Sequence, residues 1–142
     1  MTMTSWTDSF GGTTASAWDV EDRLNDLTVP WGTDYSFGYD GEGQRTLLSS
    51  TTGRNSTMGY TNGLLSALSH IQAGVTLTDL AYEYDADGPL SGIIANPNPS
   101  KSKAISYDSL NRLVQVADGV PVSQGGTPIP TEDYAYDGEG MA

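Results

Sequence analysis

The segment Asp34-Tyr35-Ser36-Phe37-Gly38-Tyr39-Asp40-Gly41-Glu42-Gly43-Gln44-Arg45 decides the fold of this chain. Apolar and polar residues alternate over 34–39, which places three aromatic side chains on one face of an extended strand. Residues 40–43 have the composition of a turn, and residues 45–52 have that of a returning strand. The segment therefore predicts an antiparallel β-hairpin with an aromatic residue and an aspartate at its turn.

The same pair of residues recurs along the chain. An aromatic residue is followed directly by aspartate at Trp18-Asp19, Tyr39-Asp40, Tyr84-Asp85, Tyr107-Asp108 and Tyr136-Asp137. Tyr60 is a degenerate copy, because threonine follows it in place of aspartate. With Tyr60 included, successive aromatic positions are 21, 21, 24, 23 and 29 residues apart. Such recurrence indicates one supersecondary unit used repeatedly.

The remaining segments extend this prediction. Strand patterns cover 56–60, 76–84, 103–107 and 112–116, and Asn62-Gly63 predicts a tight reversal. Residues 64–71 also fit a helical period, but their position after an Asn-Gly turn favours a strand over a helix. Segments 95–100 and 123–130 contain prolines that lack the donor hydrogen of a sheet, so they are predicted to be loops between repeats.

The predicted fold class is all-β, with tandem antiparallel hairpins that form a curved open strip or a partial β-shell. Residues 1–14 are expected to be an N-terminal segment, either irregular or a truncated repeat. Residues 15–142 are expected to hold about five to six hairpin units. The last copy stops within its own motif, which suggests a fragment or a unit that needs a partner. Unpaired strand edges also favour self-association of the chain.

The aromatic and aspartate residues have separate expected roles. The tyrosine covers a strand pair while its hydroxyl reaches the solvent edge. The aspartate begins the turn and accepts hydrogen bonds from backbone N–H groups two or three residues on, while glycine or asparagine supplies a positive φ. These residues are therefore predicted to be structural, and they also form a candidate ligand face.

Composition excludes several classes of function. The 142 residues carry 6 basic and 18 acidic side chains, and the isolated basic residues argue against nucleic acid as a partner. The absence of cysteine excludes disulfides, thiolate metal sites and cysteine nucleophiles. The first residues have neither the basic end nor the apolar run of a signal peptide, and no stretch approaches the ~20 apolar residues of a membrane helix.

No catalytic centre is predicted. His70 is the only histidine, and a triad with Ser66 or Ser69 is disfavoured because neighbouring strand residues do not converge. A partly exposed strand residue is the preferred interpretation of this histidine. The acidic turns offer oxygen atoms to Ca²⁺, but solvated turns are preferred, and neither a metal nor a cofactor is predicted. The tryptophans are interpreted as core residues rather than as a sugar-stacking surface; they are Trp6, Trp18 and Trp31.

The repeated motif resembles the YD repeat of the Rhs and wall-associated protein family. The resemblance covers residues 15–142 and rests on Tyr39-Asp40-Gly41-Glu42-Gly43-Gln44-Arg45, Tyr84-Asp85-Ala86-Asp87-Gly88-Pro89-Leu90 and Tyr107-Asp108-Ser109-Leu110-Asn111-Arg112-Leu113. Departures from the family pattern are Trp18 in place of tyrosine, Gln44 and Pro89 in place of arginine, and the missing aspartate after Tyr60.

The resemblance implies hairpins joined into a strip that, in full-length members, spirals into a hollow shell around a toxic C-terminal domain. Related repeats occur in bacterial insecticidal toxin complexes and in teneurins, and carbohydrate binding has been attributed to them. The expected function is therefore a structural segment of a secreted or cell-surface repeat protein that encloses or displays a toxin or effector. The expected partners are the remainder of that protein or a second copy. A glycan-binding module and an enzyme are the alternatives.

Overall fold

The computed structural model describes residues 2–136 and confirms the all-β prediction. Two short 3₁₀ segments, η1 (Pro99–Lys101) and η2 (Val122–Gln124), interrupt the strands. The strands are β1 (Thr2–Thr7), β2 (Thr13–Trp18), β3 (Leu24–Thr28), β4 (Asp34–Tyr39), β5 (Arg45–Ser50), β6 (Arg54–Thr61), β7 (Leu64–Gln72), β8 (Val75–Tyr84), β9 (Leu90–Asn96), β10 (Lys103–Tyr107), β11 (Leu113–Asp118) and β12 (Ile129–Asp133).

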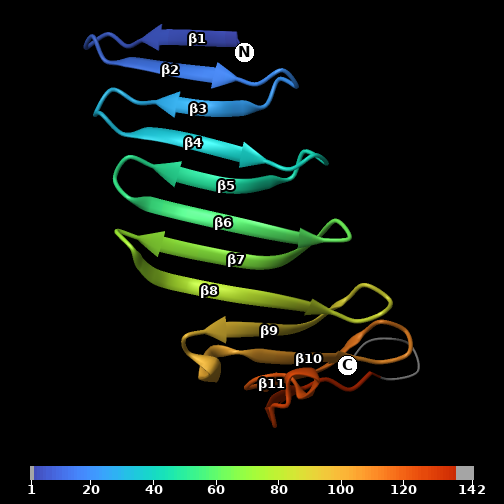
Figure 1. Ribbon diagram of the computed structural model, residues 1–142. Helices are drawn as coiled ribbons and strands as arrows, with labels where there is room; N and C mark the ends of the chain where they lie inside the picture. Colours follow the sequence, from blue (N-terminus) through green and yellow to red (C-terminus); the bar gives the residue numbers. More distant parts are fainter. Residues whose placement is uncertain (1, 137–142) are drawn as a thin grey trace. The chain divides into compact units, whose positions relative to one another are not determined.

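The strands form one open antiparallel sheet in which their order follows the chain from β1 to β12. Figure 1 labels the first eleven of them. The chain divides into two compact units. The first comprises Met1–Tyr60 with Leu68–Leu77, and the second comprises Thr61–Ala67 with Thr78–Ala142. Within the described part of the chain, no helix is long and apolar enough to cross a membrane.

In the first unit, consecutive strands are antiparallel, and the turns that connect them lie alternately at one end of the strands and at the other (Figure 1). The pairing of β2 with β3 shifts register at Ala17/Trp18, and that of β4 with β5 shifts at Gly38/Tyr39. The aromatic residues stay paired, Trp18 with Leu24 and Tyr39 with Arg45, and the extra residue of each bulge lies on the returning strand, at Asn25 and Thr46. The predicted hairpin around Asp40 is therefore present, with a bulge on its returning strand.

In the second unit, β8 pairs with β9, β9 with β10, and β10 with β11, and bulges again precede Tyr84 and Tyr107. The prediction that segments 95–100 and 123–130 lie wholly outside the sheet is wrong at their ends. Ala95 and Asn96 belong to β9, while Ile129 and Pro130 begin β12. Pro130 is tolerated because β12 pairs only with β11 among the described residues, so its missing donor faces an unpaired side.

The uncertain segment 64–71 lies in β7, so the prediction of a strand there is confirmed. The Asn-Gly reversal is confirmed too, because Asn62 and Gly63 both have positive φ, at 52° and 78°. The turn between β7 and β8 was not predicted. There Ala73 (φ 48°) and Gly74 (φ 81°) adopt the same pair of conformations without an asparagine.

Little of the chain is buried, which is the behaviour of a single-layered sheet. Ala17, Val29, Ala95 and Ala117 are the buried hydrophobic residues, and Gly92 and Pro121 are buried as well. The prediction that the tryptophans are core residues is wrong for two of them, because Trp6 is 65% exposed and Trp31 is 76% exposed. Trp31 lies in the turn between β3 and β4, where no second layer covers it.

The two ends of the repeat region differ in what the structure describes. The expected N-terminal segment 1–14 contains β1 and the first residues of β2, joined by a turn at Asp8. Tyr136 lies within the described residues, whereas Asp137 and the rest of the last motif lie outside them.

Candidate functional site

In four of the repeats, the aspartate after the aromatic residue closes its own turn. At Asp40, the backbone N–H groups of Glu42 and Gln44 donate to Oδ1 at 3.0 and 2.9 Å. Two backbone bonds complete the loop, because the Asp40 N–H donates to the Gln44 carbonyl and the Gly43 N–H donates to the Asp40 carbonyl. Gly43 has φ +83°, which a side chain would strain. The predicted Asx turn is therefore present, with its second donor four residues on.

The same bonds recur at Asp19 and Asp108, whose Oδ1 atoms each accept two backbone N–H groups. Asp85 accepts only one, from Asp87, because position four is Pro89 and has no N–H. Asp8 also forms the full turn, with the N–H groups of Phe10 and Gly12 at 2.9 and 2.8 Å.

Asp8 was missed because threonine precedes it instead of an aromatic residue. The sequence pattern that could have identified this turn is an aspartate followed three residues later by glycine, here Asp8 and Gly11. The turn that begins at Val29 has the same backbone bonds with no carboxylate at all. The aspartate therefore strengthens a turn that backbone geometry alone can form.

The tyrosines of the repeats bond to backbone carbonyl groups of the preceding hairpin. The hydroxyl of Tyr39 donates to Leu24 O at 2.9 Å, and that of Tyr107 donates to Leu90 O at 3.1 Å. The remaining three pairs are Tyr60 with Arg45 O, Tyr84 with Leu65 O, and Tyr136 with Leu113 O, at 3.1, 2.9 and 2.7 Å. The hydroxyls were predicted to reach the solvent edge, and the structure adds that each of them donates to a backbone carbonyl.

The accepting carbonyls lie where neighbouring strands stop pairing. Between β3 and β4 the ladder runs only as far as Asp26↔Ser36, so Leu24 has no partner residue on β4. Between β9 and β10 it runs only as far as Gly92↔Ala104, which leaves Leu90 in the same position. An unpaired carbonyl that is withdrawn from water costs free energy, and the tyrosine hydroxyl supplies the missing donor.

The presence of tryptophan at position 18 follows from the same relation between the aromatic side chain and the end of the strand ladder. Its side chain has no hydroxyl, and here the neighbouring strands β1 and β2 stay paired through Thr2↔Trp18. No carbonyl of β1 therefore needs a donor from that side chain. The substitution of tryptophan for tyrosine is confined to the place where the ladder continues to the end of the strand.

Two arginines connect an aspartate turn to the next tyrosine. Arg23 Nε donates to Asp19 Oδ2 at 2.8 Å, and the guanidinium lies 4.8 Å from the centroid of the Tyr39 ring. Arg112 contacts Asp108 at 2.7 Å and the Tyr136 ring at 4.4 Å in the same way. Cations attract the faces of aromatic rings, so these arginines couple consecutive repeats. Gln44 and Pro89 stand at the equivalent positions of two other repeats.

The arginine also changes the acidity of the aspartate that it contacts. The backbone N–H of Arg23 donates to the Asp19 carboxylate and lowers its pKa below the ordinary value of 3.8, and the guanidinium adds to this effect. The pKa of Asp108 is lowered in the same way by the N–H and side chain of Arg112. Hydrogen bonds to the ionised form favour that form.

The hydrogen bond of the His70 ring is with a serine other than the two considered from the sequence. Its Nδ1 atom lies 2.7 Å from Ser56 Oγ, on the neighbouring strand β6. Ser56 is only 7% exposed, so its hydroxyl is out of reach of a substrate. Within residues 2–136 no group of three or more metal-ligating side chains is found, and the turn aspartates already accept backbone N–H groups.

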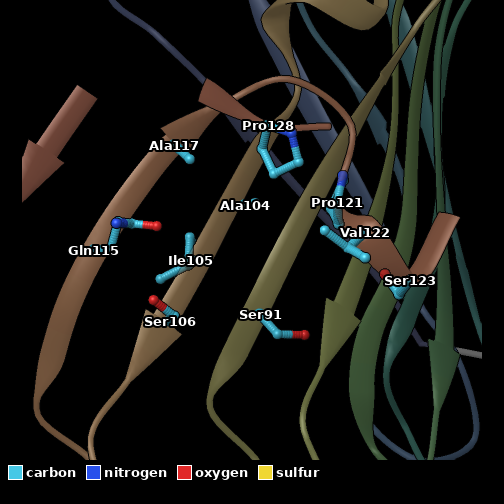
Figure 2. Close-up of a pocket in the computed structure, with 10 residues that line it drawn as sticks. All are labelled: Ser91, Ala104, Ile105, Ser106, Gln115, Ala117, Pro121, Val122, Ser123 and Pro128. Atoms are coloured by element: carbon cyan, nitrogen blue, oxygen red, sulfur yellow. The ribbon is translucent and has the colours of Figure 1, made fainter. Parts of the chain in front are cut away.

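Two pockets lie in the second unit. One, of about 420 Å³, lies between β7 and β8 and is lined by Thr61, Asn62, Leu64, Ser66, Tyr82, Tyr84, Asp85, Ala86 and Gly88. It therefore includes one aromatic-aspartate pair of the repeat, Tyr84-Asp85. The other, of about 310 Å³, lies over β9, β10 and β11 beneath the segment that follows β11 (Figure 2).

Comparison with known proteins shows similarity at the level of fold. The sequence matches no protein-family model and no curated protein. The crystal structure of TcdB2-TccC3 aligns with 94% of this chain at 22% identity and a TM-score of 0.70. That of TcdB2-TccC3-TEV aligns with 94% at 23% identity and a TM-score of 0.69, and that of TcdB2-TccC3-Cdc42 with 80% at 23% identity and a TM-score of 0.65.

This chain is much shorter than the solved structures that it resembles. It spans 8% of the TcdB2-TccC3 and TcdB2-TccC3-TEV chains and 6% of the TcdB2-TccC3-Cdc42 chain. The likeness therefore concerns a short succession of hairpins within a far longer polypeptide.

Proposed function

We propose that this chain is a segment of a larger Rhs-type repeat protein, in which its sheet forms part of a wall that encloses or displays a toxin or effector. The resemblance of the motif to YD repeats and the similarity of fold to TcdB2-TccC3 both support this role. The repeat region would begin near residue 15, with residues 1–14 contributing a truncated repeat. The larger protein would be secreted or held at the cell surface.

The observation that carries the proposal is the series of tyrosine-to-carbonyl hydrogen bonds. Each bond joins a hairpin to its predecessor, and the bonds of Tyr39 to Leu24 and of Tyr107 to Leu90 do so at the point where the ladder ends. A wall only one layer thick has no large core to hold it together. Bonds between consecutive units supply continuity in such a structure, much as interfaces do in other repeat proteins.

The role is non-catalytic. The single histidine bonds a buried serine, and the turn carboxylates are engaged with backbone N–H groups. The partners would be further repeats of the same protein, or a second copy that adds a strand at β1 or β12.

Deletion of this segment from the full-length protein tests the proposal. We expect the complete coding sequence to contain further Tyr-Asp copies on one or both sides and a distinct domain beyond them. Limited proteolysis should leave that domain intact in the complete protein and degrade it once residues 15–136 are removed in frame. Equal protection in both proteins, or a coding sequence without further repeats, would contradict the proposed role.

Carbohydrate binding is a second candidate, favoured by the larger pocket of the second unit. Tyr82 offers a ring there, and Asn62, Ser66 and Asp85 offer polar groups. Sites of this kind combine an apolar surface with a few convergent polar side chains. Titration with oligosaccharides, followed by NMR shifts of labelled tyrosine, should show saturable changes at Tyr82 that a Tyr82→Ala variant lacks. Unchanged spectra at millimolar sugar would exclude this candidate.

A further inference from the structure

A row of small residues crosses three strands of the second unit and ends at a carboxylate. The register places Glu83 of β8 opposite Gly92 of β9, Gly92 opposite Ala104 of β10, and Ala104 opposite Ala117 of β11. Residues directly opposite each other in antiparallel strands point to the same face of the sheet. Gly92, Ala104 and Ala117 therefore form a shallow trough, with Glu83 at one end.

The segment 119–128, here called the strap, folds back over this trough. Gly119 lies against Pro128, and the Gly126 N–H donates to the Pro121 carbonyl at 3.1 Å, so the two ends of the strap are close together. The strap contains the short 3₁₀ segment η2, whose turn is closed by a hydrogen bond from the Gln124 N–H to the Pro121 carbonyl. Compact loops of this form are ordered by their own contacts.

Pro121 is the side chain that occupies the trough. It is buried, and a Cβ atom placed on Gly92 would lie 2.6 Å from its Cγ atom. Only glycine at position 92 therefore leaves room for the proline ring. Figure 2 shows Pro121, Val122 and Ser123 of the strap beside the strands that carry Ser91, Ala104 and Ile105.

Glu83 fixes the next two residues of the strap. Its Oε2 atom accepts the Ser123 hydroxyl at 2.6 Å, and its Oε1 atom accepts the Gln124 amide at 2.6 Å. Hydrogen bonds to a charged acceptor are the stronger kind. The carboxylate has neutral donors on both oxygens, so the trough selects an uncharged chain with a hydroxyl followed by an amide.

We propose that this trough is a peptide-binding groove, which the strap occupies in cis and an uncharged peptide that adopts the same 3₁₀ turn and has the same chemistry can occupy in trans. Such a peptide carries proline, a spacer residue, serine and glutamine. The pocket of about 310 Å³ that remains beside the strap is lined by no charged side chain, which suits the same class of ligand. The groove is separate from the aromatic-aspartate turns.

The test uses the full chain and a fluorescein-labelled peptide with the sequence of residues 119–125. In one variant, Pro121→Ala, Ser123→Ala and Gln124→Ala together weaken the strap. This variant should bind the peptide at least about tenfold more tightly than the unaltered chain, because an intramolecular occupant reduces the apparent affinity for a competitor. Thr127→Ala, also in the strap, is the matched control and should bind like the unaltered chain.

Adding Glu83→Ala to the weakened strap should reduce the peptide affinity by about tenfold or more, since two charge-assisted hydrogen bonds are lost. Gly92→Val should abolish binding by filling the place of the proline ring. A peptide with alanine in place of proline should also fail to bind. No binding to the strap variant, or binding that survives Glu83→Ala, would overturn the proposal.

A second measurement uses the unaltered chain and so does not depend on the folding of any variant. Excess peptide should displace the strap and accelerate hydrogen exchange at the Gly126 amide, whose acceptor is Pro121 O. The amide of Gly43, in the first unit, is the internal reference and should exchange at the same rate throughout. Unchanged exchange at Gly126 under saturating peptide would also overturn the proposal.

Discussion

The hydroxyl of Tyr39, at the end of β4, donates a hydrogen bond of 2.9 Å to the carbonyl oxygen of Leu24, at the start of β3. The strand ladder ends two residues short of Leu24, so this carbonyl depends on the tyrosine for a donor. The same relationship holds for the tyrosines at positions 60, 84, 107 and 136. The hydroxyl, and not the ring alone, is therefore the part of the motif that joins one hairpin to the next.

Removal of single hydroxyl groups should destabilise the chain. Tyr39→Phe and Tyr107→Phe are each expected to lower the free energy of unfolding by about 0.5–1.5 kcal/mol, because a carbonyl loses its donor while the ring is retained. Urea denaturation followed by circular dichroism measures the change. Tyr35→Phe is the matched control, since its hydroxyl makes no hydrogen bond with any of residues 2–136, and it should remain within about 0.5 kcal/mol of the unaltered chain.

Acid should weaken the two turns that contain an arginine. The pKa of Asp19 and that of Asp108 lie below 3.8 in the folded chain, so each carboxylate stabilises the fold fully at pH values above 3.8. That stabilisation is lost as the pH falls through the lowered folded-state values. Denaturation midpoints measured between neutral pH and the acid limit should therefore fall less steeply in Asp19→Asn and Asp108→Asn than in the unaltered chain. The same dependence of the denaturation midpoint on pH in the variants and the unaltered chain would contradict the stabilising role of these two carboxylates.

Arg112 should contribute through both of its contacts. Arg112→Gln keeps the backbone N–H that bonds Asp108 but removes the guanidinium from Asp108 and from the Tyr136 ring. We expect a lower urea midpoint and a smaller sensitivity to salt than in the unaltered chain, because screening weakens the ion pair. Lys101→Gln, at a basic residue with no such ring contact, is the control. A salt dependence that is the same in all three proteins would argue against the coupling.

The unpredicted turn between β7 and β8 offers a stabilising change. Ala73 has φ 48°, a conformation in which a side chain is strained. Ala73→Gly should raise the free energy of unfolding by about 0.5–1 kcal/mol, after the larger entropy of glycine in the unfolded chain is subtracted from the relieved strain. The reverse change next to it, Gly74→Ala (φ 81°), should destabilise the chain. Thermal denaturation of both variants measures whether each change raises or lowers the stability of the chain.

Much of the fold could be predicted because the same pattern of strand and turn recurs, so that a clear copy helps to interpret an ambiguous one. The alternation at Tyr35, Phe37 and Tyr39 predicted a strand that the structure places at Asp34–Tyr39. Residues 64–71 were ambiguous by propensity, yet their place after Asn62-Gly63 predicted β7. Ala73-Gly74 was missed because alanine rarely adopts positive φ, so the sequence carries no asparagine signal there.

The site could be predicted less well than the fold. The Asx turns followed from the chemistry of aspartate and glycine, and Asp8 was missed because threonine, and not an aromatic residue, precedes it. The acceptors of the tyrosine hydroxyls could not be derived, because Leu24 is identified as an acceptor only once the ladder between β3 and β4 is known to stop at Asp26. The contact between Pro121 and Gly92 is likewise visible only in three dimensions.

Carbonyl carbon NMR tests directly whether the tyrosine hydroxyls join the hairpins. Four of the five accepting carbonyls belong to leucine, at positions 24, 65, 90 and 113, so leucine labelled with ¹³C at its carbonyl reports on all four. In Tyr39→Phe, the resonance of Leu24 should move upfield while those of Leu65, Leu90 and Leu113 stay in place. A Leu24 resonance that does not move, in a variant that remains folded, would contradict the joining role of the hydroxyl.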